Sequence, residues 1–153
     1  MSEHQAGIFD RSFTEHLFLE FALGGGHSVE AVRAALREAL AVAGERTPVL
    51  MACGPGLWDR LGEGFDFPPF SLEGMVPATQ GDLLIWIQAD NRSALFDAGL
   101  RVHRLLAREL DLQLDVPAFV YHDLRDPSGF GDGIGHPEGP RAKDGEHHPR
   151  RPR

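Results

Sequence analysis

One carboxylate near the end of the chain lies among glycines, in a pattern suited to acid–base chemistry. Residues 129–133 read Gly129-Phe130-Gly131-Asp132-Gly133, and glycines let a backbone turn sharply and approach a ligand closely. The apolar residues 118–121 predict a strand just before them, and loops at strand ends commonly carry catalytic groups. Asp-Gly is also an ordinary turn signal. The pattern alone therefore leaves open a solvated turn and a site built on Asp132.

Other residues that could bind a metal or act as nucleophiles are scattered along the chain. His103 lies beside the apolar stripe of a predicted helix, and we interpret it as partly exposed rather than as a metal ligand. His136, His147 and His148 lie in loop and tail sequence and are interpreted as solvated. Cys53 ends a short apolar run, where a buried, inert thiol is the default interpretation. No metal site is predicted.

Six segments have the hydrophobic periodicity of a strand or a helix, and these elements must position the glycine-rich loop. Alternation of apolar residues predicts strands, and an apolar repeat of three to four residues predicts helices. Ser28 is a suitable N-cap for the first helix. Because proline cannot donate to a β-ladder, the last strand should begin at Ala118 or lie at a sheet edge. The predicted order is strand 14–23, helix 29–43, strand 49–53, strand 82–89, helix 93–110 and strand 118–122.

This order is the split βαβ pattern of the ferredoxin-like fold. We expect an α+β domain, βαββαβ, in which a four-stranded antiparallel sheet carries two helices on one face. Phe18, Leu84 and Trp86 should then lie on the other face, buried against a second domain or subunit. A helical turn is expected near residues 57–61, and an ordered loop pinned by aromatic residues over 65–80.

Composition and charge limit the possible domain organisation and the kinds of molecule that the chain could bind. Residues 1–13 read as a flexible N-terminal arm, 14–139 as one domain, and 140–153 as a disordered basic tail with almost no hydrophobic residue. The net charge is −8; residues 140–153 contribute +3, so residues 1–139 carry −11. An acidic body argues against nucleic-acid binding. No signal peptide and no membrane span are predicted, and the single cysteine agrees with a reducing cytoplasm.

Three blocks carry a resemblance to a known family. Residues 54–61 read GPGLWDRL, residues 77–84 read PATQGDLL, and residues 125–133 read RDPSGFGDG. In this order and spacing they resemble the N-terminal half of dye-decolourising (DyP-type) haem peroxidases, over roughly residues 14–139. The last block matches the family's G-x-x-D-G motif at Gly129, Asp132 and Gly133. Family members contain two ferredoxin-like domains, in agreement with the predicted element order.

The resemblance implies reduction of hydrogen peroxide at haem b, coupled to oxidation of dyes or other aromatic donors. Asp132 would be the catalytic distal acid, which moves a proton between the two peroxide oxygens. Gly129, Phe130, Gly131 and Gly133 would border the cofactor.

The family's iron-ligating histidine and distal arginine come from its second half, which has no counterpart here. Since haem iron needs an axial ligand, the chain is expected to be incomplete alone, acting with a missing second domain or as a homo-oligomer. The abrupt change of composition after residue 139 suggests a truncated or frameshifted gene.

Two other functions fit the same fold. One is a non-enzymatic ferredoxin-like module that dimerises or binds a partner through its apolar sheet face. The other is a small enzyme, such as a cofactor-independent monooxygenase, with a pocket between sheet and helices; no acid–base pair inside the predicted core supports it.

Overall fold

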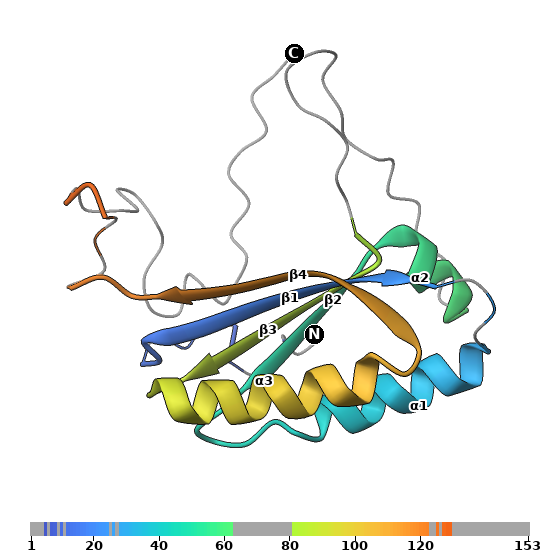
Figure 1. The fold of residues 1–153 in the computed structure, drawn as a ribbon, viewed down its shortest axis with the longest axis horizontal. Helices are drawn as coiled ribbons and strands as arrows, with labels where there is room; N and C mark the ends of the chain where they lie inside the picture. Colours follow the sequence, from blue (N-terminus) through green and yellow to red (C-terminus); the bar gives the residue numbers. More distant parts are fainter. Residues whose placement is uncertain are drawn as a thin grey trace, which may run out of the picture.

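Four antiparallel strands form one sheet, and two long helices lie on one side of it (Figure 1). The computed structural model describes residues 12–24, 28–62 and 81–122, together with 5, 7, 8, 10, 26, 125 and 127–129. The elements are β1 (Glu15–Leu23), α1 (Val29–Leu40), β2 (Val49–Cys53), α2 (Pro55–Arg60), β3 (Leu83–Ala89), α3 (Arg92–Leu106) and β4 (Leu110–Phe119). The strand order β2-β3-β1-β4 confirms the predicted ferredoxin-like fold.

Both long helices begin at capping side chains. Ser28 accepts a hydrogen bond from the N–H of Ala31 (3.1 Å), and Asn91 accepts one from the N–H of Ala94 (2.9 Å). Each bond satisfies an N–H that the first helical turn leaves without a partner. The helices end at Leu40 and Leu106, earlier than predicted. The second prediction ran too far because Leu110, an apolar residue in helical register, is the buried first residue of β4.

The prediction that the last strand begins at Ala118 is wrong, because β4 begins at Leu110 and contains Pro117. The alternative, an edge position, is confirmed. On β3, the N–H of Gln88 donates to Pro48, on the β2 side. The hydrogen-bonding direction alternates along a strand, so the N–H of Ile87, next to Gln88, points the other way, toward β1. Ile87 pairs with Leu17, and Leu17 pairs with Pro117 on its other side. The backbone nitrogen of Pro117 therefore points away from β1, toward the free edge. No ladder hydrogen bond is lost there.

The free edge of β2 is occupied by a side chain. The amide of Gln5 donates to the carbonyl oxygen of Met51 (2.7 Å) and accepts from its N–H (3.0 Å). This pair of bonds imitates a neighbouring strand at one residue. Both edges of the sheet are therefore modified in ways that oppose pairing with another strand.

The core lies between the sheet and the helices. Its largest fully buried side chains include Leu19 and Phe21 of β1, Ile85 and Ile87 of β3, and Leu106 of α3. The alternate residues point to the opposite side, here called the open face. Cross-strand partners share a face, so the registers assign to the open face His16, Phe18, Leu84, Trp86, Leu114 and Val116.

Two sequence predictions fall on residues outside the described part of the chain. These are the ordered loop over 65–80 and the disordered tail over 140–153. The division into an arm over 1–13, a domain over 14–139 and a tail stays a prediction. None of the described helices is long and apolar enough to cross a membrane.

Candidate functional site

The segment that leads to Asp132 turns back on itself after β4. The N–H of Val120 donates to Thr14 (2.8 Å), which extends the pairing with β1 by one residue. The N–H of Arg125 then donates to the carbonyl oxygen of Tyr121 (3.1 Å). The rings of Tyr121 and His122 are in contact, with centroids 4.1 Å apart. The chain is thus folded at the end of β4 before the glycine-rich block begins.

The guanidinium of Arg125 fixes the first glycine of that block. Its Nη1 donates to the carbonyl oxygen of Gly129 at 3.0 Å. Gly129 has φ +89°, in the left-handed region that favours glycine. The first glycine of the expected motif is therefore required by the backbone. Asp132, Phe130, Gly131 and Gly133 lie outside the described residues, and their roles stay predictions.

An aromatic cluster occupies the middle of the open face. Phe18 and Trp86 are directly paired across β1 and β3, and their rings stack with centroids 5.7 Å apart. The indole Nε1–H of Trp86 donates to Nδ1 of His16 at 3.1 Å. Burial lowers the pKa of His16, and the nearby Glu15 carboxylate opposes that shift. The cluster is thus held by a hydrogen bond that needs His16 neutral.

Aliphatic side chains flank the cluster on the same face. Leu84, Leu114 and Val116 are 38%, 46% and 39% exposed. Together with Phe18 and Trp86 they make an apolar surface over β1, β3 and β4, of which the sequence predicted Phe18, Leu84 and Trp86. The hydrogen bond between His16 and Trp86 was not predicted from the sequence, although alternation placed each residue on the face of its strand opposite the aliphatic row.

The first two sequence blocks meet at the other end of the sheet. The N–H of Gly54, before α2, donates to the carbonyl oxygen of Asp82 (2.7 Å). The Asp82 carboxylate accepts from the N–H of Leu23, at the end of β1 (2.7 Å). A side chain at Gly54 would overlap the backbone of Gly81. These residues therefore join α2 to the ends of β1 and β3.

The third block lies far from this junction. β1 pairs Leu23 with Leu110 at one end of β4 and Glu15 with Phe119 at the other. Figure 1 shows α2 at the right end of the sheet and the turn after β4 at the left. The structure therefore assigns the first two blocks to the scaffold and leaves the third as the candidate site.

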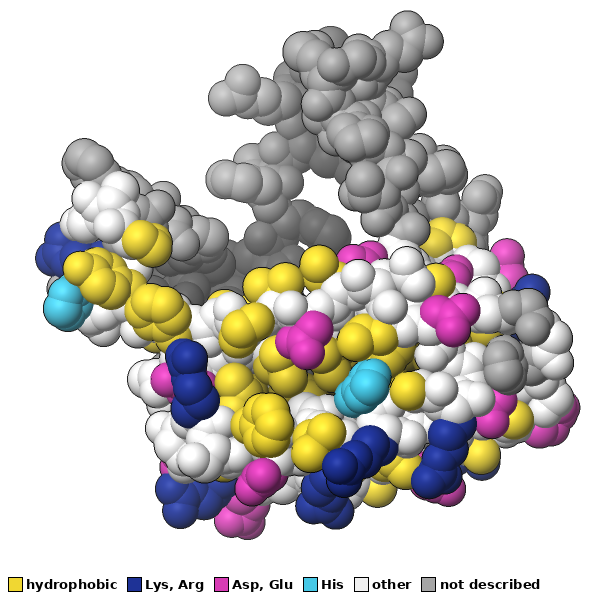
Figure 2. Space-filling model, in the orientation of Figure 1, with side chains coloured by type: hydrophobic (Ala, Val, Ile, Leu, Met, Phe, Trp, Pro, Cys, Tyr) yellow, Lys and Arg dark blue, Asp and Glu magenta, His cyan; other side chains and the backbone are white. Residues whose placement is uncertain are grey.

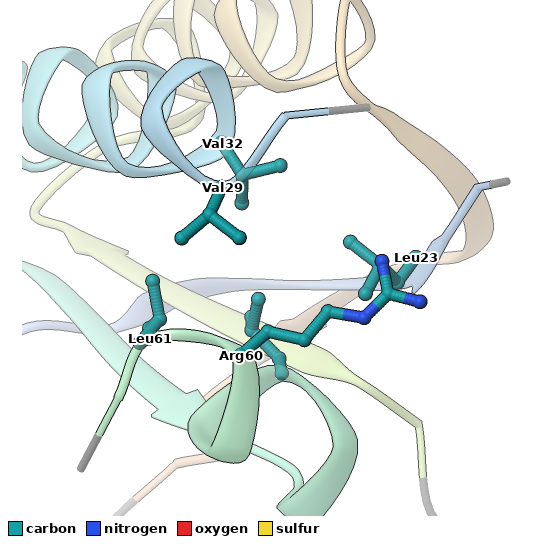
Figure 3. A pocket seen from close by; sticks show the side chains of 6 residues that line it. Leu23, Val29, Val32, Arg60 and Leu61 are labelled. Atoms are coloured by element: carbon teal, nitrogen blue, oxygen red, sulfur yellow. The ribbon is translucent and has the colours of Figure 1, made fainter. Parts of the chain in front are cut away.

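A small cavity beside α2 is too narrow for a cofactor. Figure 3 shows Val29 and Val32 of α1 facing Leu61, with the Arg60 side chain extended toward Leu23. The cavity volume is about 10 Å³, the space of roughly one water-sized probe. We interpret it as a packing gap between α1 and α2.

The described residues fit the expected haem only in part. The open face offers the apolar, aromatic surface that a flat macrocycle contacts. An axial ligand to iron is a second requirement, and the described part of the chain brings together no group of three or more His, Cys, Asp or Glu that could hold a metal. Burial raises the pKa of the Cys53 thiol, which disfavours a thiolate ligand. The described residues do not form a complete haem site by themselves.

Comparison with known proteins confirms the resemblance. No family model matches the chain. A dye-decolorizing peroxidase from Mycobacterium tuberculosis is 35% identical over 101 residues, which are 61% of this chain and 30% of that protein. The chain therefore spans about a third of the length of this curated relative.

Solved structures of similar fold also extend beyond the chain. A variant of DypB from Rhodococcus jostii RHA1 in complex with heme superposes with a TM-score of 0.74 and 23% identity, covering 92% of this chain and 51% of DypB. An encapsulated DyP-type peroxidase from Mycobacterium smegmatis superposes with a TM-score of 0.71 and 21% identity, covering 91% of this chain and 50% of that protein. The chain is similar in sequence to part of a dye-decolorizing peroxidase and has the fold of about half of such an enzyme.

Proposed function

We propose that this chain supplies the distal side of a DyP-type haem peroxidase site, with Asp132 as its acid. The observation that carries the proposal is the left-handed backbone of Gly129, the first residue of the G-x-x-D-G match, held by a hydrogen bond from Arg125 in the segment after β4. The similarity to a dye-decolorizing peroxidase supports it. The activity is reduction of hydrogen peroxide coupled to oxidation of an aromatic donor.

Asp132 handles a proton in this proposal. As a carboxylate it accepts the proton of one peroxide oxygen and returns it to the other, which leaves as water. Haem b, when bound, would supply the electrons that cleave the O–O bond. Gly129, Phe130, Gly131 and Gly133 border the cofactor, and the three glycines, which have no side chain, allow a close backbone approach.

The iron ligand comes, in this proposal, from a second domain. The relatives contain a further half that this chain does not match, and the apolar open face is a surface that such a domain, or a second copy, would cover. We further propose that the protein works in the cytoplasm, where its single cysteine stays a thiol.

Haem titration of the purified chain tests the proposal. The titration is run on the chain alone and on the chain mixed with the separately expressed C-terminal half of the Mycobacterium tuberculosis relative. We expect a saturable Soret shift and peroxide-dependent dye oxidation in the mixture. Asp132→Asn should lower the peroxide-dependent rate by about 10²-fold or more, while Asp115→Asn, on β4, should leave it unchanged.

Two results would contradict the proposal. One is a Soret shift with full dye oxidation in the Asp132→Asn variant, which would remove the acid from its role. The other is a folded chain that gives no Soret shift, either alone or mixed with the C-terminal half, which would favour the non-enzymatic partner-binding module.

A further inference from the structure

An apolar groove runs between α3 and β4, on the side of the sheet that carries the helices. Its floor is formed by Leu17 and Leu19 of β1, and its β4 wall by Leu112, Asp115 and Pro117. Its volume is about 400 Å³, within the range of ligand-binding clefts. Figure 2 shows hydrophobic side chains gathered between β4 and α3. Two helices do not cover four strands, so the inner side of β4 stays open.

The α3 wall is one continuous helical stripe. Its residues follow the spacing i, i+3, i+4, i+7, i+8, i+11 and are Arg92, Leu95, Phe96, Gly99, Leu100 and His103. At 1.5 Å per residue this stripe is roughly 16 Å long. The middle is apolar, and each end carries a polar side chain. Arg92 is fixed at its end by hydrogen bonds to Glu15 of 2.9 and 3.1 Å.

Large apolar side chains are also exposed at the rim of the groove. Phe96 is 65% exposed on the α3 side, and Leu112 is 37% exposed on the β4 side. Phe96 and Leu112 also line the cavity, so an occupant confined to the cavity would cover only the inner side of each. An occupant that is wider than the cavity would cover both rims.

Addition of a strand to β4 is disfavoured. Strand addition needs a row of free N–H and C=O groups along the edge, and Pro117 removes a donor from that row in the second half of β4. The occupant therefore has to contact side chains of the groove rather than the backbone of the edge.

The charged residues on α3 indicate the sign of the charge that the occupant should carry. Arg101, Arg104 and Arg108 are exposed on the outer side of α3 and its C-terminal extension, against one exposed carboxylate there, Asp97, so this side carries a net positive charge. Figure 2 shows arginine side chains, with some acidic ones among them, along the lower margin of the molecule, below the hydrophobic patch. The opposite wall carries Asp115. An occupant with acidic residues toward α3 matches this arrangement.

We propose that the groove binds an amphipathic helix of about three turns, whose apolar face fills the groove and whose acidic flank lies along α3. Helices dock in grooves through residues spaced i, i+3, i+4 and i+7, which complements the stripe on α3. The added helix would complete the layer over β4. This inference is independent of the haem proposal, because it concerns the helix side of the sheet and not the open face.

Two synthetic peptides of about 15 residues test the groove. Both place Leu at i, i+3, i+4 and i+7; one has Glu on the α3 flank and the other has Lys. We expect NMR shift changes confined to α3 and β4 residues of the groove, and binding of the Glu peptide roughly tenfold tighter, with the difference lost at high salt. Equal binding of both peptides would contradict the assigned sign.

Three variants locate the site on the folded chain. Phe96→Ala should weaken binding of the Glu peptide by roughly fivefold or more, and Arg104→Glu should reverse the preference between the peptides. Leu114→Ala removes an exposed apolar side chain (46% exposed) from the open face and should leave binding unchanged. Shift changes on the open face, or a groove filled by laurate while neither peptide binds, would overturn the proposal.

Discussion

The hydrogen bond between His16 and Trp86 on the open face makes the stability of the fold depend on pH. Neutral imidazole accepts the indole N–H at Nδ1, whereas the imidazolium has no free lone pair to accept it. Burial lowers the pKa of His16 from its ordinary value of 6.5, so the folded state binds this proton more weakly than the unfolded chain does. The free energy of unfolding is therefore greatest above about pH 6.5 and falls as pH drops through the lowered pKa.

The first prediction concerns this dependence. We expect His16→Asn to flatten the fall in the free energy of unfolding below about pH 6.5, because an asparagine accepts the same hydrogen bond and does not titrate. The measurement is urea unfolding followed by tryptophan fluorescence between pH 5 and 8. His103→Asn, on the helix side, is the matched control and should keep the slope. An unchanged slope in His16→Asn would show that other groups cause the pH dependence.

Gly54 and Gly44 both lie in connections between elements, but they differ in how much space a side chain would have. Gly54 connects β2 to α2, and a Cβ there would overlap the backbone carbonyl of Gly81 at the start of β3. A backbone atom cannot move aside as a side chain can, because its strand is fixed by the sheet. Gly44, in the turn before β2, has only the Thr47 hydroxyl at 3.6 Å from that position.

The second prediction compares these two junctions. Gly54→Ala should lower the free energy of unfolding by about 1–3 kcal/mol or more, as overpacking does. Gly44→Ala should stay within about 0.5 kcal/mol of the original chain. Urea unfolding of both variants checks this. Equal free energies of unfolding of the two variants would mean that the segment before β3 can shift away from Gly54 without loss of stability.

On the scale of the whole molecule, its two sides expose different apolar surfaces. The open face carries Leu84, Leu114 and Val116, while the groove on the helix side carries Leu112 and Phe96. Both free sheet edges oppose strand pairing, at Gln5 and at Pro117. Self-association of the chain should therefore occur through a face and not through an edge.

The third prediction assigns that association to the open face. We expect the chain to form dimers or larger species, because apolar patches of this kind drive association. Leu114→Lys with Val116→Lys should shift the chain to monomer in analytical ultracentrifugation. Leu112→Lys, on the other side of the same strand, should leave association intact. A monomeric original chain would contradict the prediction.

Sequence alone determined most of the scaffold, because its signals are local. Alternating residues located β1 and β3, a short apolar run before Gly54 located β2, and Ser28 located the start of α1. The glycine pattern selected the third block, and Gly129 indeed has a backbone conformation suited to glycine. The position of Asp132 in a site stays a prediction, since it lies outside the described residues.

Only the tertiary structure decided what depends on neighbours in space. The sequence left open whether the last strand begins after Pro117 or lies at an edge, and the pairing of β4 with β1 turns the Pro117 nitrogen to a free edge, where a missing donor costs no ladder bond. The bond between His16 and Trp86 joins residues 70 positions apart. The groove exists because two helices cannot cover four strands. Each of these features is set by cross-strand register and layer packing, which local periodicity does not encode.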